Sequence, residues 1–124
     1  MATKIEVQRV YDRKAVSRGK RILVDRVWPR GIKKEALHLD QWLRELAPST
    51  PLRKWFGHDP KKWPEFQRRY REELRQPGQR ERLRDLAALV RQGPVTLLYS
   101  ARDEEHNQAV ALRGVLEDSV RNAK

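Results

Sequence analysis

The sequence predicts an α/β fold in one small domain over residues 1–124, in which helices flank a short, mostly parallel sheet of three or four strands and the middle segment is helical. Two observations predict this fold. Apolar or alternating runs at residues 5–10, 22–27 and 95–99 are typical of short strands. Between and after these runs, apolar residues recur every three or four positions, as on the buried face of a helix. A chain of 124 residues allows one hydrophobic core.

The first two predicted strands differ in the burial that their patterns indicate. Residues 5–10 alternate apolar and polar side chains, which is typical of a half-exposed strand. The run 22–24 is apolar on both faces, so the strand 22–27 should lie centrally in the sheet. The segment that joins them is short for a parallel crossover, which normally takes about a dozen residues or more. Whether these two strands pair therefore stays open.

Helices are predicted where apolar side chains share one stripe and a proline, a glycine or a capping residue marks an end. The predicted helices cover residues 33–46, 52–56, 64–75, 79–92 and 104–120, and Asp103 is the predicted N-cap of the last. Their predicted inner residues are Leu39, Trp42, Leu43 and Leu46; Phe66, Tyr70 and Leu74; Leu83, Leu86, Ala87 and Val90; and Ala109, Leu112, Leu116 and Val120.

The composition excludes several classes of protein. The chain has no cysteine, which excludes disulfides, a thiolate nucleophile and a cysteine-ligated zinc site. His38, His58 and His106 stand singly, so we predict no metal, although ligation by a histidine and distant carboxylates stays an alternative. No apolar stretch approaches the roughly 20 residues of a membrane span, and no signal-peptide pattern is present. We therefore expect a cytoplasmic protein without a membrane partner.

The chain is strongly basic. Lys and Arg number 28 against 17 Asp and Glu, which gives a formal net charge of +11. A field of this sign attracts phosphates, nucleic acid and acidic partners. Much of the excess lies where Glu and Arg alternate, at residues 68–75 and 80–84, and such runs are also typical of solvated helix faces. Both interpretations of the charge stay open.

Polar and aromatic side chains follow two of the predicted strands. Asp25, Arg26, Trp28 and Arg30 come after the second strand, and Ser100 to Asp103, with His106 and Asn107, come after the last. If these strands are parallel neighbours, both groups share the edge of the sheet where ligands usually bind in α/β proteins. Guanidinium groups bind phosphate and carboxylate in bidentate fashion.

We assign candidate roles to these residues and to others outside the two strand ends. Arg18, Arg26 and Arg30 are the candidate anion contacts, and Asp25, Asp103 and His106 are the candidate catalytic residues for proton transfer or positioning. The remaining candidates for ligand binding are Trp28 and Trp55 as apolar or stacking walls, together with His58 and Asn107.

Each role has a structural alternative. Asp103 also suits a helix cap, and Asp25 could form a structural ion pair with Arg26, Arg18 or Arg102. Trp28 could plug the end of the sheet, and His106 could be a surface or packing residue. In residues 52–60, Trp55 and Phe56 could stack on a nucleobase or pack a short helix onto the core, while His58 and Asp59 could form a base with its orienting partner or simply a turn.

The chain resembles the YeaO-like branch of the domain-of-unknown-function 488 family. The resemblance runs from about residue 5 to residue 116 and is carried by residues 10–12, 24–31, 42–49, 52–58, 66, 69–70 and 96–101, with Asp103, His106, Asn107 and Ala109. It implies a small cytosolic prokaryotic protein and no established activity. Longer relatives carry cysteines near the position of His106, and this chain has none.

These observations favour a pocket that binds an anionic, phosphate-bearing small molecule or nucleotide, with or without a hydrolase or transferase step. The sequence contains no nucleophile elbow, no phosphate-binding P-loop and no G-x-G-x-x-G fingerprint, and it identifies no cofactor. The alternative is a nucleic-acid-binding module that uses its basic surface without catalysis. The ligand and the oligomeric state stay open.

Overall fold

Over residues 5–12 and 19–122, which the computed structural model describes, four parallel strands form one sheet in the order β1-β4-β2-β3. The strands are β1 (Ile5–Arg9), β2 (Lys20–Leu23), β3 (Gln41–Trp42) and β4 (Val95–Tyr99). Residue Val95 of β4 is aligned with Ile5 of β1 on one side and with Lys20 of β2 on the other. The first two strands are therefore separated by β4, which answers the question of their pairing.

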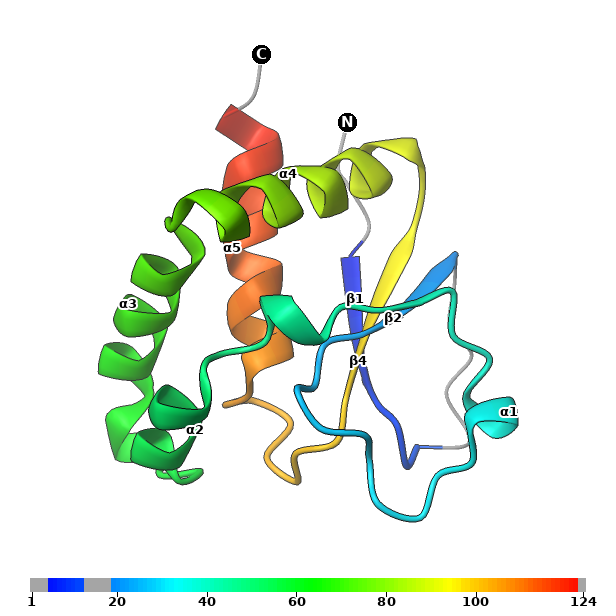
Figure 1. The fold of residues 1–124 in the computed structure, drawn as a ribbon, viewed down its shortest axis with the longest axis horizontal. Coiled ribbons are helices and arrows are strands. Elements are labelled where there is room, and N and C mark those ends of the chain that lie inside the picture. The colour runs from blue at the N-terminus through cyan, green and yellow to red at the C-terminus, as the bar shows by residue number, and fades with distance from the viewer. Residues whose placement is uncertain (1–4, 13–18, 123–124) are drawn as a thin grey trace.

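Five α-helices are found in the described part of the chain, joined by two short 3-10 turns (Figure 1). The helices are α1 (Lys34–Leu37), α2 (Thr50–Phe56), α3 (Trp63–Leu74), α4 (Pro77–Gln92) and α5 (Gln108–Asn122), and the turns are η1 (Arg44–Leu46) and η2 (Pro60–Lys62). In Figure 1, α3, α4 and α5 lie to one side of the sheet and α1 lies to the other. The α/β class, the parallel sheet and the helical middle segment are confirmed.

Two hydrophobic clusters cover the two faces of the sheet. Because side chains alternate along a strand, Leu97 faces a large cluster with α2 to α5 while Leu98 faces a smaller one with Leu37 of α1. Most of the predicted inner residues of the last three helices are buried in the large cluster; Leu83 and Val120 only pack against its margin. The central position of the second strand is confirmed, since Ile22 and Leu23 are fully buried on opposite faces.

The second strand ends earlier than predicted. The structure assigns β2 to Lys20–Leu23, whereas the sequence predicts a strand at residues 22–27. Val24 still donates its N–H to the carbonyl oxygen of Leu98, over 3.0 Å. Beyond it the chain leaves the ladder and turns at Pro29, which has no N–H to donate.

The predicted helix at residues 33–46 is wrong. The chain forms α1 over one turn, passes His38 in the left-handed conformation at a φ of 50°, and then forms β3 and η1. The predicted stripe is divided between the two faces, because Trp42 belongs to the small cluster and Leu46 to the large one. Pairing with β2 outweighs the helical spacing: the N–H of Leu43 donates to the carbonyl oxygen of Leu23 over 2.9 Å.

The last helix begins at Gln108, four residues later than predicted, and Asp103 is not its cap. Instead, Oδ1 of Asn107 accepts a hydrogen bond from the N–H of Val110 at 3.0 Å, which is the geometry of an N-cap. Asp103 caps the turn before it, where its Oδ1 accepts from the N–H groups of Glu105 and His106. The predicted N-cap is therefore wrong, since Asn107, four positions after Asp103, has that role.

Among the described residues, no helix has the length and apolar character that crossing a membrane requires.

Candidate functional site

A pocket of about 880 Å³ opens at the edge of the sheet where β1, β2 and β4 end. All strands of the described sheet are parallel, so the segments that follow them meet at this edge. The strand ends contribute Arg9, Tyr11, residues 25–30 and residues 100–103; the start of α5 contributes Asn107 and Gln108; and the segment from η1 to α3 contributes Ala47, Pro48, Arg53, Phe56, His58 and Phe66. The two groups of residues that the sequence places after β2 and β4 line one cavity.

Most of the sequence-predicted site residues line this pocket. They are Asp25, Arg26, Trp28, Arg30, His58, Asp103 and Asn107. His106 and Trp55 are absent from the described lining, and Arg18 lies outside the described residues. Sequence reasoning missed Arg9 and Tyr11, which lie at the end of a predicted strand, and Gln108, which only the tertiary fold brings to the edge. Arg53 belongs to the basic and aromatic segment at residues 52–60 but is not among the predicted anion contacts.

Asp25 is a buried residue of the pocket lining, with 7% of its surface exposed. Its Oδ1 accepts hydrogen bonds from Nε2 of Gln108 at 2.5 Å and from the N–H of Ser100 at 3.4 Å. Burial raises the pKa of Asp25, and the hydrogen bonds from Ser100 and Gln108 and the charge of Arg53 oppose that rise. Within the described residues, the carboxyl group forms no ion pair with Arg26 or Arg102.

The positive charge of the pocket comes from five arginines, set against two aspartates. Two of the five are held by backbone carbonyls. Nε and Nη2 of Arg26 donate to Pro48 and Ala47 at 3.0 and 2.9 Å, and Nε of Arg9 donates to Ala101 at 2.9 Å. A guanidinium has five N–H donors, so both retain donors after these contacts. Their charges are thereby positioned at the pocket before any anion arrives.

Aromatic rings form the apolar part of the lining. Phe56 and Phe66 are buried and stack with their ring centroids 4.3 Å apart. Trp28 is half-buried, packs edge-on against Trp42 at 5.3 Å and donates its Nε1–H to the carbonyl oxygen of Ile32 at 2.6 Å. Trp28 thus packs against the small cluster and also lines the pocket, and contact of its ring with a ligand stays a prediction.

Asp103 and His106 form a local pair at one side of the site. Nδ1 of His106 lies 2.9 Å from Oδ2 of Asp103, and the imidazole packs edge-on against Trp63 at 5.3 Å. The N–H of Glu105, followed by the His106 side chain, lowers the pKa of Asp103. An aspartate whose hydrogen bonds stabilise its ionised form is a poor proton donor, and His106 serves as a packing residue here.

His58 lies at the pocket but is not oriented by Asp59. The His58 backbone is left-handed, with a φ of 58°, and its side chain is exposed. Asp59 instead caps η2, where its Oδ1 accepts from the N–H of Lys61 at 3.0 Å. The predicted pair of a base and its orienting carboxylate is replaced by a turn with its cap.

Trp55 lies on another surface of α2 than its neighbour Phe56. Successive residues of a helix are about 100° apart, so when Phe56 faces the pocket Trp55 does not. Arg69 and Lys62 lie over the indole at 4.2 and 5.0 Å from its centroid. Trp55 lines a smaller cavity of about 400 Å³ next to Ser49 and Glu73, and its expected place as a wall of the main pocket is wrong.

Comparison with known proteins places the chain in a family. Residues 4–124 match the family described as the inactive DUF488-N3 subclade. The chain belongs to this family. The match to DUF488 confirms the resemblance seen in the sequence.

Relatives of this DUF488 chain are described as uncharacterised. YeaO of Escherichia coli strain K12 is 48% identical over 109 residues, which cover 87% of the chain and 92% of YeaO. Rv3073c of Mycobacterium tuberculosis strain H37Rv and Mb3100c of Mycobacterium bovis are each 40% identical over 114 residues, which cover 92% of the chain and 94% of either relative. No solved structure matches the chain. Within the described residues, no cluster of three or more histidine or carboxylate side chains could hold a metal ion.

Proposed function

We propose that this DUF488 protein binds a phosphate-bearing small molecule or nucleotide in the pocket at the carboxyl edge of its sheet. The observation that carries the proposal is the convergence of five arginines on one cavity, two of them held by backbone carbonyls. Preorganised guanidinium groups bind phosphate strongly because little side-chain freedom is lost on binding. A volume of about 880 Å³ is within the range of small-molecule sites.

Binding without turnover is the form of the proposal that the residues support. Asp103 is occupied by three hydrogen bonds, and His106 packs on Trp63. General acid–base catalysis requires a group within hydrogen-bond reach of the reacting atom, and these two are engaged elsewhere. The description of the subclade as inactive agrees with a binding role. The cytoplasm is the proposed compartment, since phosphorylated metabolites are made and used there.

The sharpest test replaces pocket arginines whose side chains donate no hydrogen bond to a backbone carbonyl in the described structure. Arg26→Ala is a poor choice, because Arg26 also donates to Ala47 and Pro48 and its loss would disturb the fold. Arg53→Ala and Arg30→Ala remove exposed pocket side chains, and Arg91→Ala removes an equal charge from the exposed end of α4. Calorimetric titration with nucleoside monophosphates, sugar phosphates and pyrophosphate should give a dissociation constant about tenfold weaker for each pocket variant.

The control decides between a pocket and a general attraction of anions. Arg91→Ala should leave the dissociation constant within about twofold, because exposed charges beyond a Debye length of about 8 Å are largely screened. If no phosphorylated compound binds the wild-type protein, the proposed function is wrong. It is equally wrong if Arg91→Ala weakens binding as much as Arg53→Ala does.

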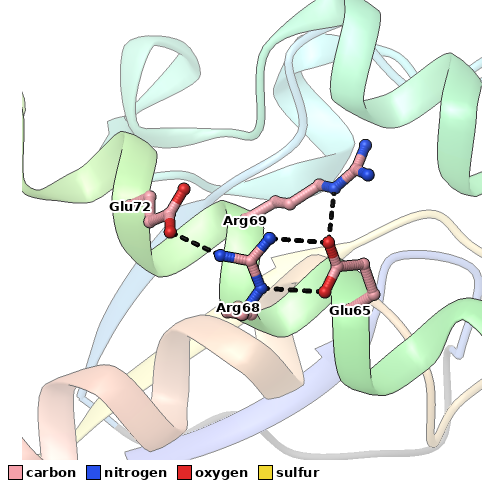
Figure 2. Close-up of polar contacts among 4 residues, drawn as sticks. All are labelled: Glu65, Arg68, Arg69 and Glu72. Carbon is pink, nitrogen blue, oxygen red and sulfur yellow. Dashed lines mark hydrogen bonds and ion pairs between the residues drawn. The ribbon is translucent and has the colours of Figure 1, made fainter.

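Binding of nucleic acid is the alternative, and the ion pairs of α3 weaken it. Figure 2 shows Arg68 between Glu65 and Glu72, with Arg69 contacting the same Glu65. These arginines are already paired with carboxylates on their own helix, as the alternating charges indicate. The alternative predicts micromolar or tighter binding of DNA or RNA that falls steeply with salt. A gel-shift titration at low salt that shows no complex would exclude it.

A further inference from the structure

The carboxyl group of Asp25 has one oxygen that is well bonded and one that is not. Oδ1 accepts from the Gln108 side chain and from the N–H of Ser100. Oδ2 is buried and accepts no hydrogen bond from a described residue, although the Ser100 side chain lies close enough to the carboxyl group to lower its pKa. Buried polar atoms nearly always have partners in proteins, because an unsatisfied one costs free energy. An exception in a residue that lines a pocket leaves an acceptor for which a ligand can supply the donor.

The surroundings of Asp25 fix the orientation of this oxygen. Gln108 is the first residue of α5, and Ser100 follows β4, so Oδ1 is held from two different elements. Asp25 itself follows β2 and lines the pocket. With Oδ1 held in this way, rotation of the carboxyl group would break contacts, so Oδ2 keeps its buried position in a residue that lines the pocket.

A phosphate group alone does not suit this acceptor. Phosphate oxygens and a carboxylate are both acceptors with negative charge, and they repel each other unless a proton lies between them. The arginines of the pocket suit the phosphate, whereas Asp25 suits a neutral group that donates hydrogen bonds. The ligand should therefore carry both a phosphate group and a neutral group that donates hydrogen bonds. In nucleotide-binding α/β proteins, a carboxylate near the end of a strand binds the hydroxyl groups of a ribose in this way.

We propose that Oδ2 of Asp25 accepts a hydrogen bond from a ribose hydroxyl, which makes the ligand of the pocket a ribonucleotide. This inference rests on the proposed phosphate-binding function. Arg53 and Arg30 then face the phosphate, and the stacked rings of Phe56 and Phe66 provide apolar surface for the base. Asp25 is a specificity-determining residue that distinguishes a ribonucleotide from its deoxy forms.

The first experiment uses the wild-type protein alone. Dissociation constants are measured by calorimetry for ribonucleoside monophosphates, for their 2′-deoxy and 3′-deoxy forms, and for inorganic phosphate. At least one ribonucleotide should bind about tenfold or more tightly than one of its deoxy forms, because a site built to bond a hydroxyl is left unsatisfied without it. Equal binding of the ribo form and both deoxy forms overturns the inference and leaves the proposed phosphate site standing.

The second experiment assigns the discrimination to Asp25. Asp25→Asn should bind ribo and deoxy forms equally and should bind inorganic phosphate at least as tightly as the wild type, because a repelling charge is removed. Asp85→Asn, an equal exchange at an exposed position of α4, should keep the discrimination.

Two results for Asp25→Asn would show that the inference is wrong. The variant could still discriminate between ribo and deoxy forms, or its affinity for inorganic phosphate could fall as much as its affinity for the ribonucleotide. If that variant does not fold, as judged by circular dichroism, the wild-type comparison decides alone. If no phosphorylated compound binds at all, the proposed function has failed as well.

Discussion

The buried carboxyl group of Asp25 should lower the stability of the free protein while it provides an acceptor for a ligand. Its carboxyl group is buried beside Arg53 and is satisfied at only one oxygen. Burying a charge without full pairing costs folding free energy, which is why the pKa of Asp25 is raised. Such strain at a pocket is expected where affinity for a ligand matters more than the stability of the free protein.

Replacing Asp25 by Asn should therefore stabilise the unliganded protein at pH 7, by about 1 kcal/mol. An acid whose folded pKa is raised binds more protons folded than unfolded, so its contribution to stability is present below the unfolded value of 3.8 and is lost as pH rises through the folded pKa. The advantage of Asp25→Asn should thus shrink as pH falls toward 4. Urea unfolding of both proteins at pH 4 and pH 7 measures this. A variant that is less stable than wild type at pH 7 would contradict it.

Among the helices, the start of α5 is where sequence and structure differ most usefully. The sequence predicts Asp103 as the N-cap of this helix, and the structure has Asn107 in that place. Only the three-dimensional contacts decide between them, because Asn107 is buried, bonds Val110 with its oxygen and donates its Nδ2–H to the carbonyl of Asp103. The single side chain therefore caps α5 and also joins the helix to the turn behind β4.

Asn107→Ala should lower the free energy of unfolding by about 1–2 kcal/mol, as the loss of an N-cap does. Asn107→Asp retains the capping oxygen at the positive end of the helix and should lose less than the alanine variant. Thermal or urea unfolding of the three proteins at pH 7 checks the order. Equal stability of the alanine variant and the wild type would show that Asn107 is not the cap.

The α1 to β3 region shows why periodicity alone misleads over short lengths. A spacing of three and four residues predicts a helix whenever one stripe is buried. Here the half-buried Trp42 packs against the small cluster and Leu46 is buried in the large one, on opposite faces of the sheet. The β2 strand supplies the hydrogen bonds that a helix would otherwise have supplied. The stripes of α3 and α4 each face the large cluster alone, and both predictions are confirmed.

For the molecule as a whole, the excess of positive charge should matter more for the rate of ligand capture than for its affinity. A net charge of +11 produces a field that extends beyond the pocket, while the contacts that hold a ligand are local. Charges outside the pocket, such as those on α4, should therefore affect the association rate, whereas the arginines of the pocket should affect the affinity.

Exchanging Arg80, Arg84 and Arg91 for glutamate tests this separation, since all three are exposed on α4 and do not line the pocket. Stopped-flow binding of a nucleotide ligand at low salt should show an association rate several-fold lower, with an unchanged dissociation rate. The difference should vanish near 1 M salt, where the Debye length is about 3 Å. A changed dissociation rate would place these arginines in contact with the ligand.

Local chemistry in the sequence was enough to predict the mostly parallel α/β class, the central position of the second strand, the last three helices and the pocket edge. Apolar runs, inner stripes, and charged and aromatic residues directly after strand ends carry this information within a few residues of each other. The strand order could not be predicted, because the sequence does not say that β4 lies between β1 and β2.

Tertiary contacts decided the rest of the site. Arg53 and Gln108 reach the pocket through the packing of α2 and α5, and Trp55 is turned away by its position on the same helix as Phe56. The bonded and unbonded oxygens of Asp25 exist only once β2, β4 and α5 meet. Hydrogen bonds and burial between distant segments depend on three-dimensional distance, which no local pattern of residues encodes.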